Sequence, residues 1–190
     1  VLIGDNPASA SYVRSKEKAC QDAGIFTETF KLSEGVSQAE VFELIDHLNH
    51  DDRFHGILTQ LPFPKQIDET STIRSLDPSK DVDGLHPFNM GLLMTGVPVF
   101  VPATPLGVQQ LLNRTDNDPN GKHVVVCGRS NIVGKPLAVL LEQKRQGANA
   151  TVTVCHTGTN NLGEITRTAD ILIAAIGSPR IIKADMVKKG

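Results

Sequence analysis

A strand, a turn bounded by glycines and the start of a helix follow one another in residues 124–137, which read VVVCGRSNIVGKPL. The backbone N–H groups at the start of such a helix favour a phosphate. The segment departs from the fingerprint G-x-G-x-x-G, because Arg129 and Ser130 stand where the central glycine is expected. It also departs from a Walker A loop, since five residues separate Gly128 from Gly134 and a proline follows the lysine. We predict a dinucleotide site; the alternative is a β-α turn that binds nothing.

The strand predicted at 151–155 ends without the acidic residue that NAD-binding folds use. His156 and Thr157 stand where an Asp or Glu would accept a hydrogen bond from the adenosine ribose. Arg129, with the Thr157 hydroxyl opposite, would instead receive a 2′-phosphate. These residues favour NADP over NAD, and the alternative is that Arg129 is a solvated loop cation. Gly177 ends the third strand, where a glycine permits close approach of a cofactor or of another backbone.

Outside this motif the chain predicts an α/β protein with two domains. Short apolar runs alternate with helical patterns, which is typical of a mainly parallel sheet covered by helices. We expect strands at 1–3, 25–30, 56–58, 123–127, 151–155 and 171–176, and helices at 9–23, 38–48, 106–113, 135–143 and 162–168. Residues 61–105 are punctuated by prolines and are expected to be irregular. The strand-helix pattern restarts after Thr104, so we place an α/β substrate domain at 1–104 and a Rossmann-like, doubly wound dinucleotide-binding domain at 105–190, with a cleft between them.

The composition excludes several classes of protein. The 190 residues include 19 Lys and Arg against 21 Asp and Glu, so the net positive charge needed for nucleic acid or anionic lipid is missing. No apolar run approaches the roughly 20 residues of a membrane span. Three cysteines show no metal-ligand spacing and no disulfide framework, so we expect no metal site and a reducing, cytoplasmic compartment. With seven Phe, one Tyr and no Trp, the core must be aliphatic, and the single tyrosine, Tyr12, stands out.

Two side chains capable of proton chemistry share one face of the first predicted helix. Tyr12 and Lys16 are at positions i and i+4. Short-chain dehydrogenases also carry a Tyr-x-x-x-Lys pair, but their glycine-rich loop precedes the pair, whereas here it follows by more than a hundred residues. The alternative is a packed tyrosine beside a solvated lysine.

Two further segments carry side chains suited to a ligand. Gln60 follows the apolar run at 56–58 just before a proline-forced turn, where open α/β sheets expose ligand contacts, and its amide both donates and accepts. Residues 77–86 hold three carboxylates among turn residues. They predict either an Asx-turn or a buried carboxylate that accepts paired N–H donors from a heterocycle.

Five motifs occur together along essentially the whole chain. They are S-x-x-Y-x-x-x-K at 9–16, GILTQLPFP at 56–64, KDVDG at 80–84, PATPxG at 102–107 and GRSxIVGKP at 128–136. In this order and spacing they closely resemble the bifunctional methylenetetrahydrofolate dehydrogenase/methenyltetrahydrofolate cyclohydrolase family. The resemblance implies that methylenetetrahydrofolate is oxidised by NADP, and that the methenyl product is hydrolysed to formyltetrahydrofolate in a cleft between two domains.

The resemblance also implies a role for each matching residue. Lys16 is the proton-transfer residue, Gln60 positions and tunes it, and Tyr12 flanks the folate. Asp83 binds the pterin, and Ser9 belongs to the same substrate site. Such roles are chemically reasonable, because water attacking a cationic methenyl carbon needs a base, and a carboxylate accepts the two-donor edge of a pterin. The matching cofactor positions are Gly128, Arg129, Ser130, Val133, Gly134, Thr157 and Gly177. Thr157 departs from the Ser that NADP-preferring members often have, so NAD stays an alternative.

The resemblance carries further expectations. Family chains begin with a segment before the first strand matched here and continue past residue 190, so we expect missing segments at both ends and no readable organelle signal. A homodimer through the nucleotide-binding domain is expected. Two alternatives to the bifunctional enzyme stay open: a dehydrogenase without cyclohydrolase activity that uses NAD or NADP, and a dinucleotide-binding module without catalysis.

Overall fold

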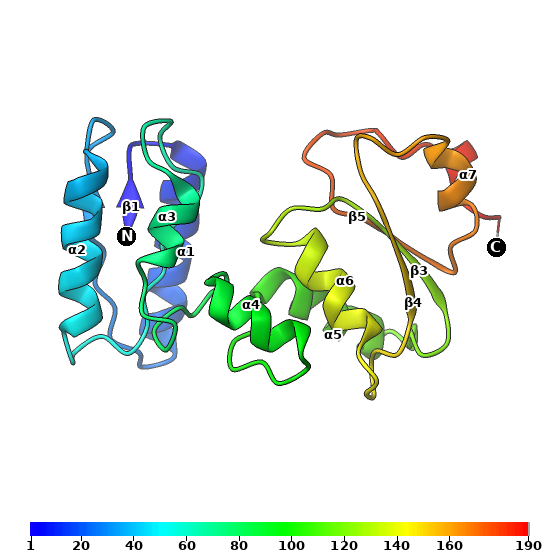
Figure 1. The fold of residues 1–190 in the computed structure, drawn as a ribbon, viewed down its shortest axis with the longest axis horizontal. Coiled ribbons are helices and arrows are strands. Elements are labelled where there is room, and N and C mark those ends of the chain that lie inside the picture. Colours follow the sequence, from blue (N-terminus) through cyan, green and yellow to red (C-terminus); the bar gives the residue numbers. More distant parts are fainter. Residues whose placement is uncertain (190) are drawn as a thin grey trace. The chain divides into compact units, whose positions relative to one another are not determined.

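The computed structural model describes residues 1–189 and forms two compact units, Val1–Val82 and Asp83–Gly190 (Figure 1). By its contacts the segment at 83–104 belongs to the second unit. The boundary that the sequence places near Thr104, between the substrate domain and the dinucleotide-binding domain, stays a prediction. The expected α/β class is confirmed in both units, since each contains parallel strands and helices.

The first unit is built on a short parallel sheet. Strands β1 (Leu2–Ile3) and β2 (Lys31–Leu32) pair in parallel, and isolated bridges join Leu2 to Gln60 and Ile57 to Asp81. The helices of this unit are α1 (Pro7–Asp22), α2 (Gln38–His50) and α3 (Glu69–Arg74).

Helix α2 supplies much of the core of the first unit. It begins with a capping box, in which the Ser37 side chain accepts from the Glu40 N–H and the Glu40 carboxylate accepts from the Ser37 N–H. Its apolar stripe at Val41, Ile45 and Leu48 is buried. Helical periodicity therefore predicted this element correctly, except that the helix ends at His50 rather than at residue 48.

Two sequence-based expectations for the first unit were wrong. The strand expected at 25–30 is irregular, and the residues that pair with β1 are Lys31 and Leu32, because long-range pairing rather than local hydrophobicity sets the register. The run at 56–58 forms only isolated bridges.

The proline-rich stretch at 61–105 contains helices that the sequence analysis missed. Helix α3 begins where the Asp68 carboxylate accepts from the Ser71 N–H at 2.7 Å. Helix α4 (Pro87–Met94) begins where His86 Nδ1 accepts from the Phe88 N–H at 3.1 Å. Pro87 occupies the first helical turn, where proline is tolerated because its missing N–H would have no partner there.

The second unit contains a three-stranded parallel sheet in the order β4-β3-β5. Its strands are β3 (His123–Cys127), β4 (Thr151–Cys155) and β5 (Ile171–Ala174). The predicted bounds of β3 and β4 are confirmed. Further helices are α5 (Ala103–Arg114), α6 (Gly134–Glu142), α7 (Leu162–Thr166) and the 3-10 turn at Ala184–Met186.

Alternate residues of β3 fill two separate cores. Val124 and Val126 are buried in a cluster with α5 and α6 residues, whereas Val125 and Cys127 are buried in a cluster with α7 residues. Helices therefore cover both faces of the sheet, as Figure 1 shows, and the expected Rossmann-like half is confirmed. Within residues 1–189, no helix is both long enough and apolar enough to cross a membrane.

Candidate functional site

The structure brings Lys16 and Gln60 into direct contact. Lys16 Nζ donates to Gln60 Oε1 at 3.0 Å, across 44 residues of sequence. Gln60 Nε2 donates to the Leu61 carbonyl at 2.8 Å, which turns the amide oxygen toward the amine. The bridge to Leu2 holds Gln60 beside the sheet. A neutral amide can thus orient the amine without placing a negative charge beside it.

Tyr12 and Ser9 lie on the same helix as Lys16 but differ in environment. Tyr12 is 65% exposed, so its ring is free to cover a bound molecule. Ser9 is buried, and its Oγ donates to the Leu61 carbonyl at 3.5 Å. Ser9 thereby links α1 to the segment that carries Gln60, while its contact with substrate stays a prediction.

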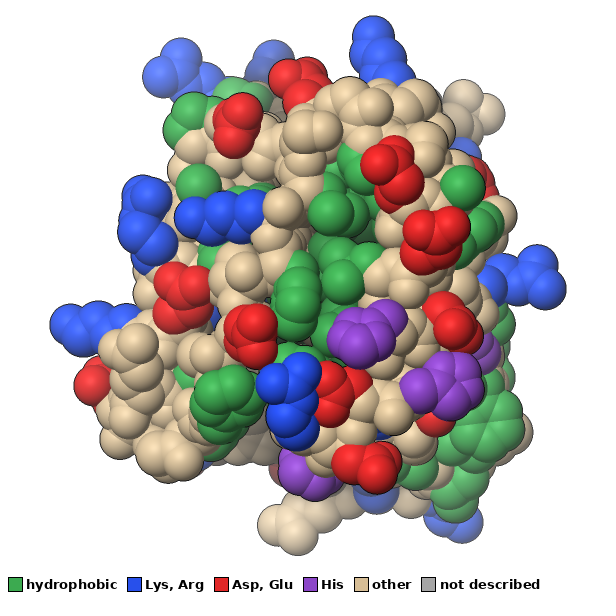
Figure 2. All heavy atoms as spheres, turned by 90° about the vertical axis from the view of Figure 1, so that its left-hand side faces the viewer, with side chains coloured by type: hydrophobic (Ala, Val, Ile, Leu, Met, Phe, Trp, Pro, Cys, Tyr) green, Lys and Arg blue, Asp and Glu red, His purple; other side chains and the backbone are tan. Residues whose placement is uncertain are grey.

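A cavity of about 550 Å³ borders Lys16 within the first unit. Its other walls include Glu17 and Cys20 of α1 together with Phe26 and Phe54. Tyr12, Gln60 and Ser9 are not among its lining residues, so the cavity does not contain the Lys16–Gln60 pair. Figure 2 shows one face of this unit, on which hydrophobic side chains line a hollow bordered by charged ones.

The KDVDG motif has a structural role that the sequence analysis did not foresee. Lys80 Nζ donates to the carbonyls of Leu48 and Asp51, each at 3.0 Å, and so caps the end of α2. The adjoining Asp77 carboxylate accepts from the Ser79 N–H at 2.7 Å, as expected of an Asx-turn. Asp83 lies half-buried in the turn at the start of the second unit.

The carboxyl ends of the three strands form one edge of the second unit. The Gly128 N–H donates to the Cys155 carbonyl at 2.8 Å, and the Ala175 N–H donates to the Cys127 carbonyl at 2.8 Å. Gly128 has φ +136, and a Cβ there would lie 2.2 Å from the Ala175 oxygen. Only glycine fits at this crossing, because the two backbones approach too closely for a side chain.

The loop between β3 and α6 is organised by Ser130. Its Oγ accepts from the N–H groups of Val133 and Gly134, at 3.2 and 3.4 Å. The N–H groups at this helix start were expected to face a phosphate. For Val133 and Gly134 this expectation is wrong, because the Ser130 hydroxyl already accepts from both N–H groups.

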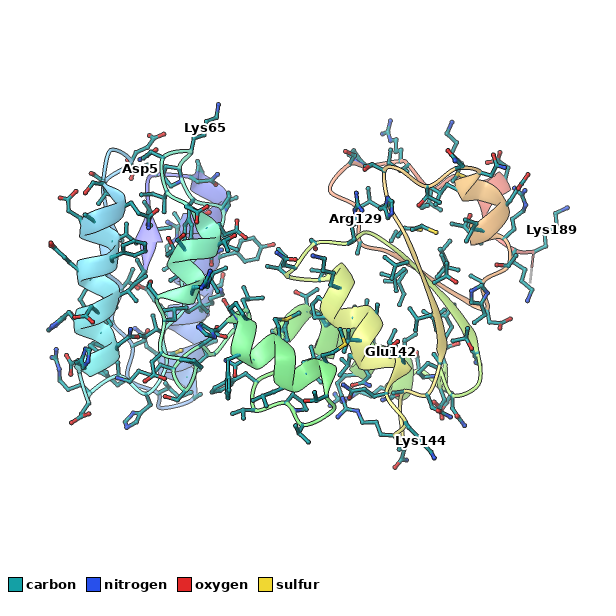
Figure 3. All side chains as sticks on the ribbon, viewed as in Figure 1. Asp5, Lys65, Arg129, Glu142, Lys144 and Lys189 are labelled. Carbon is teal, nitrogen blue, oxygen red and sulfur yellow. The ribbon has the colours of Figure 1, made fainter. Side chains whose placement is uncertain are left out.

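The remaining groups at this edge fit an anionic nucleotide. Arg129 extends from the same loop at the carboxyl end of the strands (Figure 3), and both its side chain and that of Thr157 are exposed. Gly177 lies three residues beyond the end of β5 rather than at the strand end, and a Cβ there would meet nothing within 4 Å, so this position has room for a bound group. A cation, a hydroxyl and open space thus occur where the fold class places a dinucleotide.

Beside this edge lie two thiols with little reactivity. Cys127 and Cys155 are paired in register and buried, and burial raises the pKa of Cys127 to about 11, with Cys155 adding to the effect. Burial also raises the pKa of the Cys155 thiol. Since the thiolate is the nucleophile, both should react slowly.

We expect Cys20, which is half-buried and borders the cavity, to be alkylated at least about tenfold faster than Cys127 and Cys155. Iodoacetamide labelling followed by peptide mass spectrometry measures the three rates. In denaturant the difference should disappear, because the pKa shifts depend on burial. Equal rates in the folded protein would contradict the buried environment of the strand pair.

Two protein-family models match the sequence of this chain. Residues 1–83 match the catalytic domain described as "Tetrahydrofolate dehydrogenase/cyclohydrolase, catalytic domain", and residues 102–190 match "Tetrahydrofolate dehydrogenase/cyclohydrolase, NAD(P)-binding domain". The chain belongs to the tetrahydrofolate dehydrogenase/cyclohydrolase family. Residues 84–101, which include α4, lie between the two matched ranges.

Relatives of this tetrahydrofolate dehydrogenase/cyclohydrolase chain include the Bifunctional protein FolD of Dehalococcoides mccartyi (strain CBDB1), which is 54% identical over 190 residues. The chain spans 64% of that relative's length. The fold is similar to that of a 5,10-methylenetetrahydrofolate dehydrogenase from the silkworm Bombyx mori, with 41% identity, a TM-score of 0.93, and coverage of 100% of this chain and 67% of the silkworm chain.

A second similar structure is the methylenetetrahydrofolate dehydrogenase-cyclohydrolase of Trypanosoma brucei, complexed with NADP cofactor and inhibitor. The identity is 35% and the TM-score 0.92, over 100% of this chain and 64% of the trypanosome chain.

Proposed function

We propose that this protein oxidises 5,10-methylenetetrahydrofolate to 5,10-methenyltetrahydrofolate with NADP, and hydrolyses that product to 10-formyltetrahydrofolate. The observation that carries the proposal is the hydrogen bond from Lys16 Nζ to Gln60 Oε1. It joins an amine to a neutral partner that holds it in place, in a chain whose second unit matches an NAD(P)-binding domain. The description of the Trypanosoma brucei relative as a methylenetetrahydrofolate dehydrogenase-cyclohydrolase supports both activities.

The hydrolytic step depends on Lys16. Water adds to the cationic methenyl carbon, and a proton must leave the water as the C–O bond forms. The bond from that carbon to N5 then breaks, N5 takes up the hydroxyl proton of the adduct, and the formyl group stays on N10. Lys16 in its uncharged form accepts that proton, and Gln60 orients Nζ through its amide oxygen. Tyr12, exposed one helical turn earlier, supplies a ring to flank the folate. Asp83 supplies the carboxylate for the two-donor edge of the pterin.

The oxidative step requires positioning rather than acid-base chemistry. A bound NADP would supply the hydride acceptor for the methylene carbon. Arg129 and Thr157 would hold the 2′-phosphate, while Gly128, Ser130, Val133, Gly134 and Gly177 would shape the loop and strand ends around the dinucleotide. The NADP complex of the trypanosome relative supports this choice of cofactor over NAD.

Separate assays of the two steps test the proposal. We expect NADP-dependent formation of the methenyl product from methylenetetrahydrofolate, and consumption of methenyltetrahydrofolate supplied on its own. Accumulation of the methenyl compound without hydrolysis would instead identify a dehydrogenase alone. Nucleotide binding with neither turnover would identify a binding module. A homodimer is also proposed, and light scattering of the purified protein measures it.

A further inference from the structure

Gly84 follows Asp83 in a turn whose backbone is left-handed and closely packed. Its φ is +66, and the residue is buried. A Cβ there would lie 3.1 Å from the Phe100 carbonyl oxygen and 3.3 Å from Pro102 Cδ. Gly96 has a similar φ of +82, but a Cβ at that residue would meet nothing within 4 Å. Gly84 therefore needs a close approach to its neighbours as well as a left-handed backbone.

The segment that Gly84 contacts has little freedom to move away. The Phe100 atom is a backbone oxygen, and Pro102 is buried with its φ restricted by the proline ring. Pro102 also leads directly into α5, where the Leu106 N–H donates to the Pro102 carbonyl at 3.1 Å. Neither neighbour is the flexible end of a side chain. A side chain at position 84 would therefore be accommodated by movement of the turn that contains Asp83.

The residues just before Asp83 are held by other contacts. Lys80 Nζ donates to two carbonyls at the end of α2, and the Lys80 carbonyl accepts from the Ile57 N–H at 2.7 Å. Ile57 also forms the isolated bridge to Asp81. The boundary between the two compact units directly precedes Asp83. The packing of Gly84 thus constrains the Asp83 backbone on the side of the second unit.

We propose that Gly84 is a positioning residue for substrate binding. Its lack of a side chain lets the turn lie against the Phe100 carbonyl, and this contact holds the Asp83 carboxylate in place for the two N–H donors of the pterin. Two parallel hydrogen bonds require both carboxylate oxygens to be placed correctly, so a small shift of the turn weakens them. Gly84 acts through Asp83, and the inference rests on the proposed role of Asp83 in the folate site.

Two substitutions of Gly84 in the whole protein separate the close approach from backbone strain. Gly84→Ala adds a Cβ and strains the left-handed backbone, whereas Gly84→Asn adds the same Cβ in a residue that tolerates that backbone better. We expect both to raise the KM for methylenetetrahydrofolate about tenfold, with kcat changed less than about twofold, because the weakened contact serves ground state and transition state alike. The Kd of tetrahydrofolate, which carries the same pterin edge, should rise by a similar factor in isothermal titration.

Gly96→Ala is the matched control. It introduces the same strain at a positive φ in the same unit without a near neighbour, so we expect the wild-type KM. NADP should bind every variant within about twofold of the wild type, whereas a poorly folded second unit would lose NADP as well as folate. A wild-type KM in either Gly84 variant would overturn the inference. Equal losses of NADP and folate affinity, or a raised KM in Gly96→Ala, would also contradict it.

A double-mutant cycle tests whether Gly84 acts through Asp83. Asp83→Asn replaces one acceptor oxygen by an NH₂ group that opposes the pterin donors, and it should raise the KM at least about tenfold. Adding Gly84→Ala should then raise the KM by less than about twofold more, because two changes to one contact are not additive. A further tenfold rise would show that Gly84 acts elsewhere. A wild-type KM in Asp83→Asn would instead overturn the proposed role of Asp83 itself, so the two failures are distinguishable.

Discussion

Replacing Lys16 by methionine should lower the rate of methenyltetrahydrofolate hydrolysis at least about 100-fold, because general acid-base groups typically contribute factors of that size or larger. Methionine keeps most of the aliphatic side chain but cannot accept a proton or donate to Gln60. Stability should change little, since Lys16 is exposed on α1. The measurement is the steady-state loss of the methenyl substrate supplied without nucleotide.

Lys18→Met is the matched control. Lys18 is also exposed on α1, but two residues further on it points to another side of the helix. The Lys18→Met substitution removes the same charge from the same helix, and we expect this variant to hydrolyse the methenyl substrate at the wild-type rate. NADP binding should be unchanged in both variants, because the nucleotide groups belong to the second unit. Hydrolysis at the wild-type rate in Lys16→Met would remove Lys16 from the proposed mechanism.

Replacing Gly134 by alanine should destabilise the second unit by about 3 kcal/mol and weaken NADP binding at least about tenfold. A Cβ at Gly134 would lie 2.2 Å from the Gly128 carbonyl oxygen and 2.8 Å from the Arg129 nitrogen. Both neighbours are backbone atoms, so no rotamer change relieves the clash and the loop before α6 must move. Urea unfolding measures the free energy, and isothermal titration measures the binding.

A glycine in open surroundings provides the comparison. Gly91 lies within α4, and a Cβ there would meet nothing within 4 Å. Gly91→Ala should therefore stabilise the protein, by about 0.5–1 kcal/mol, because alanine loses less backbone entropy than glycine in a helix. If both variants unfolded at the wild-type urea concentration, the close approach of α6 to the β3 loop would not limit stability.

The predicted site was partly accessible from the chain alone. The sequence predicted that Gly128 and Gly134 bound the turn between β3 and α6, because a strand that turns sharply into a helix needs glycines at such positions. The role of the Ser130 side chain was not predicted, since the sequence did not indicate that its hydroxyl accepts from two N–H groups of the helix start. The place of His156 was visible as a missing carboxylate, but its bond to Gly158 required coordinates.

By itself, the sequence determined the α/β class, the bounds of β3 and β4, the course of α2 and the order of the five motifs. These depend on periodicity and turn chemistry within a few neighbouring residues. Tertiary structure alone decided that Lys31 and Leu32, rather than 25–30, pair with β1, and that Lys16 meets Gln60 across 44 residues. Strand register and such side-chain contacts depend on distant parts of the chain packing together, and no local pattern encodes them.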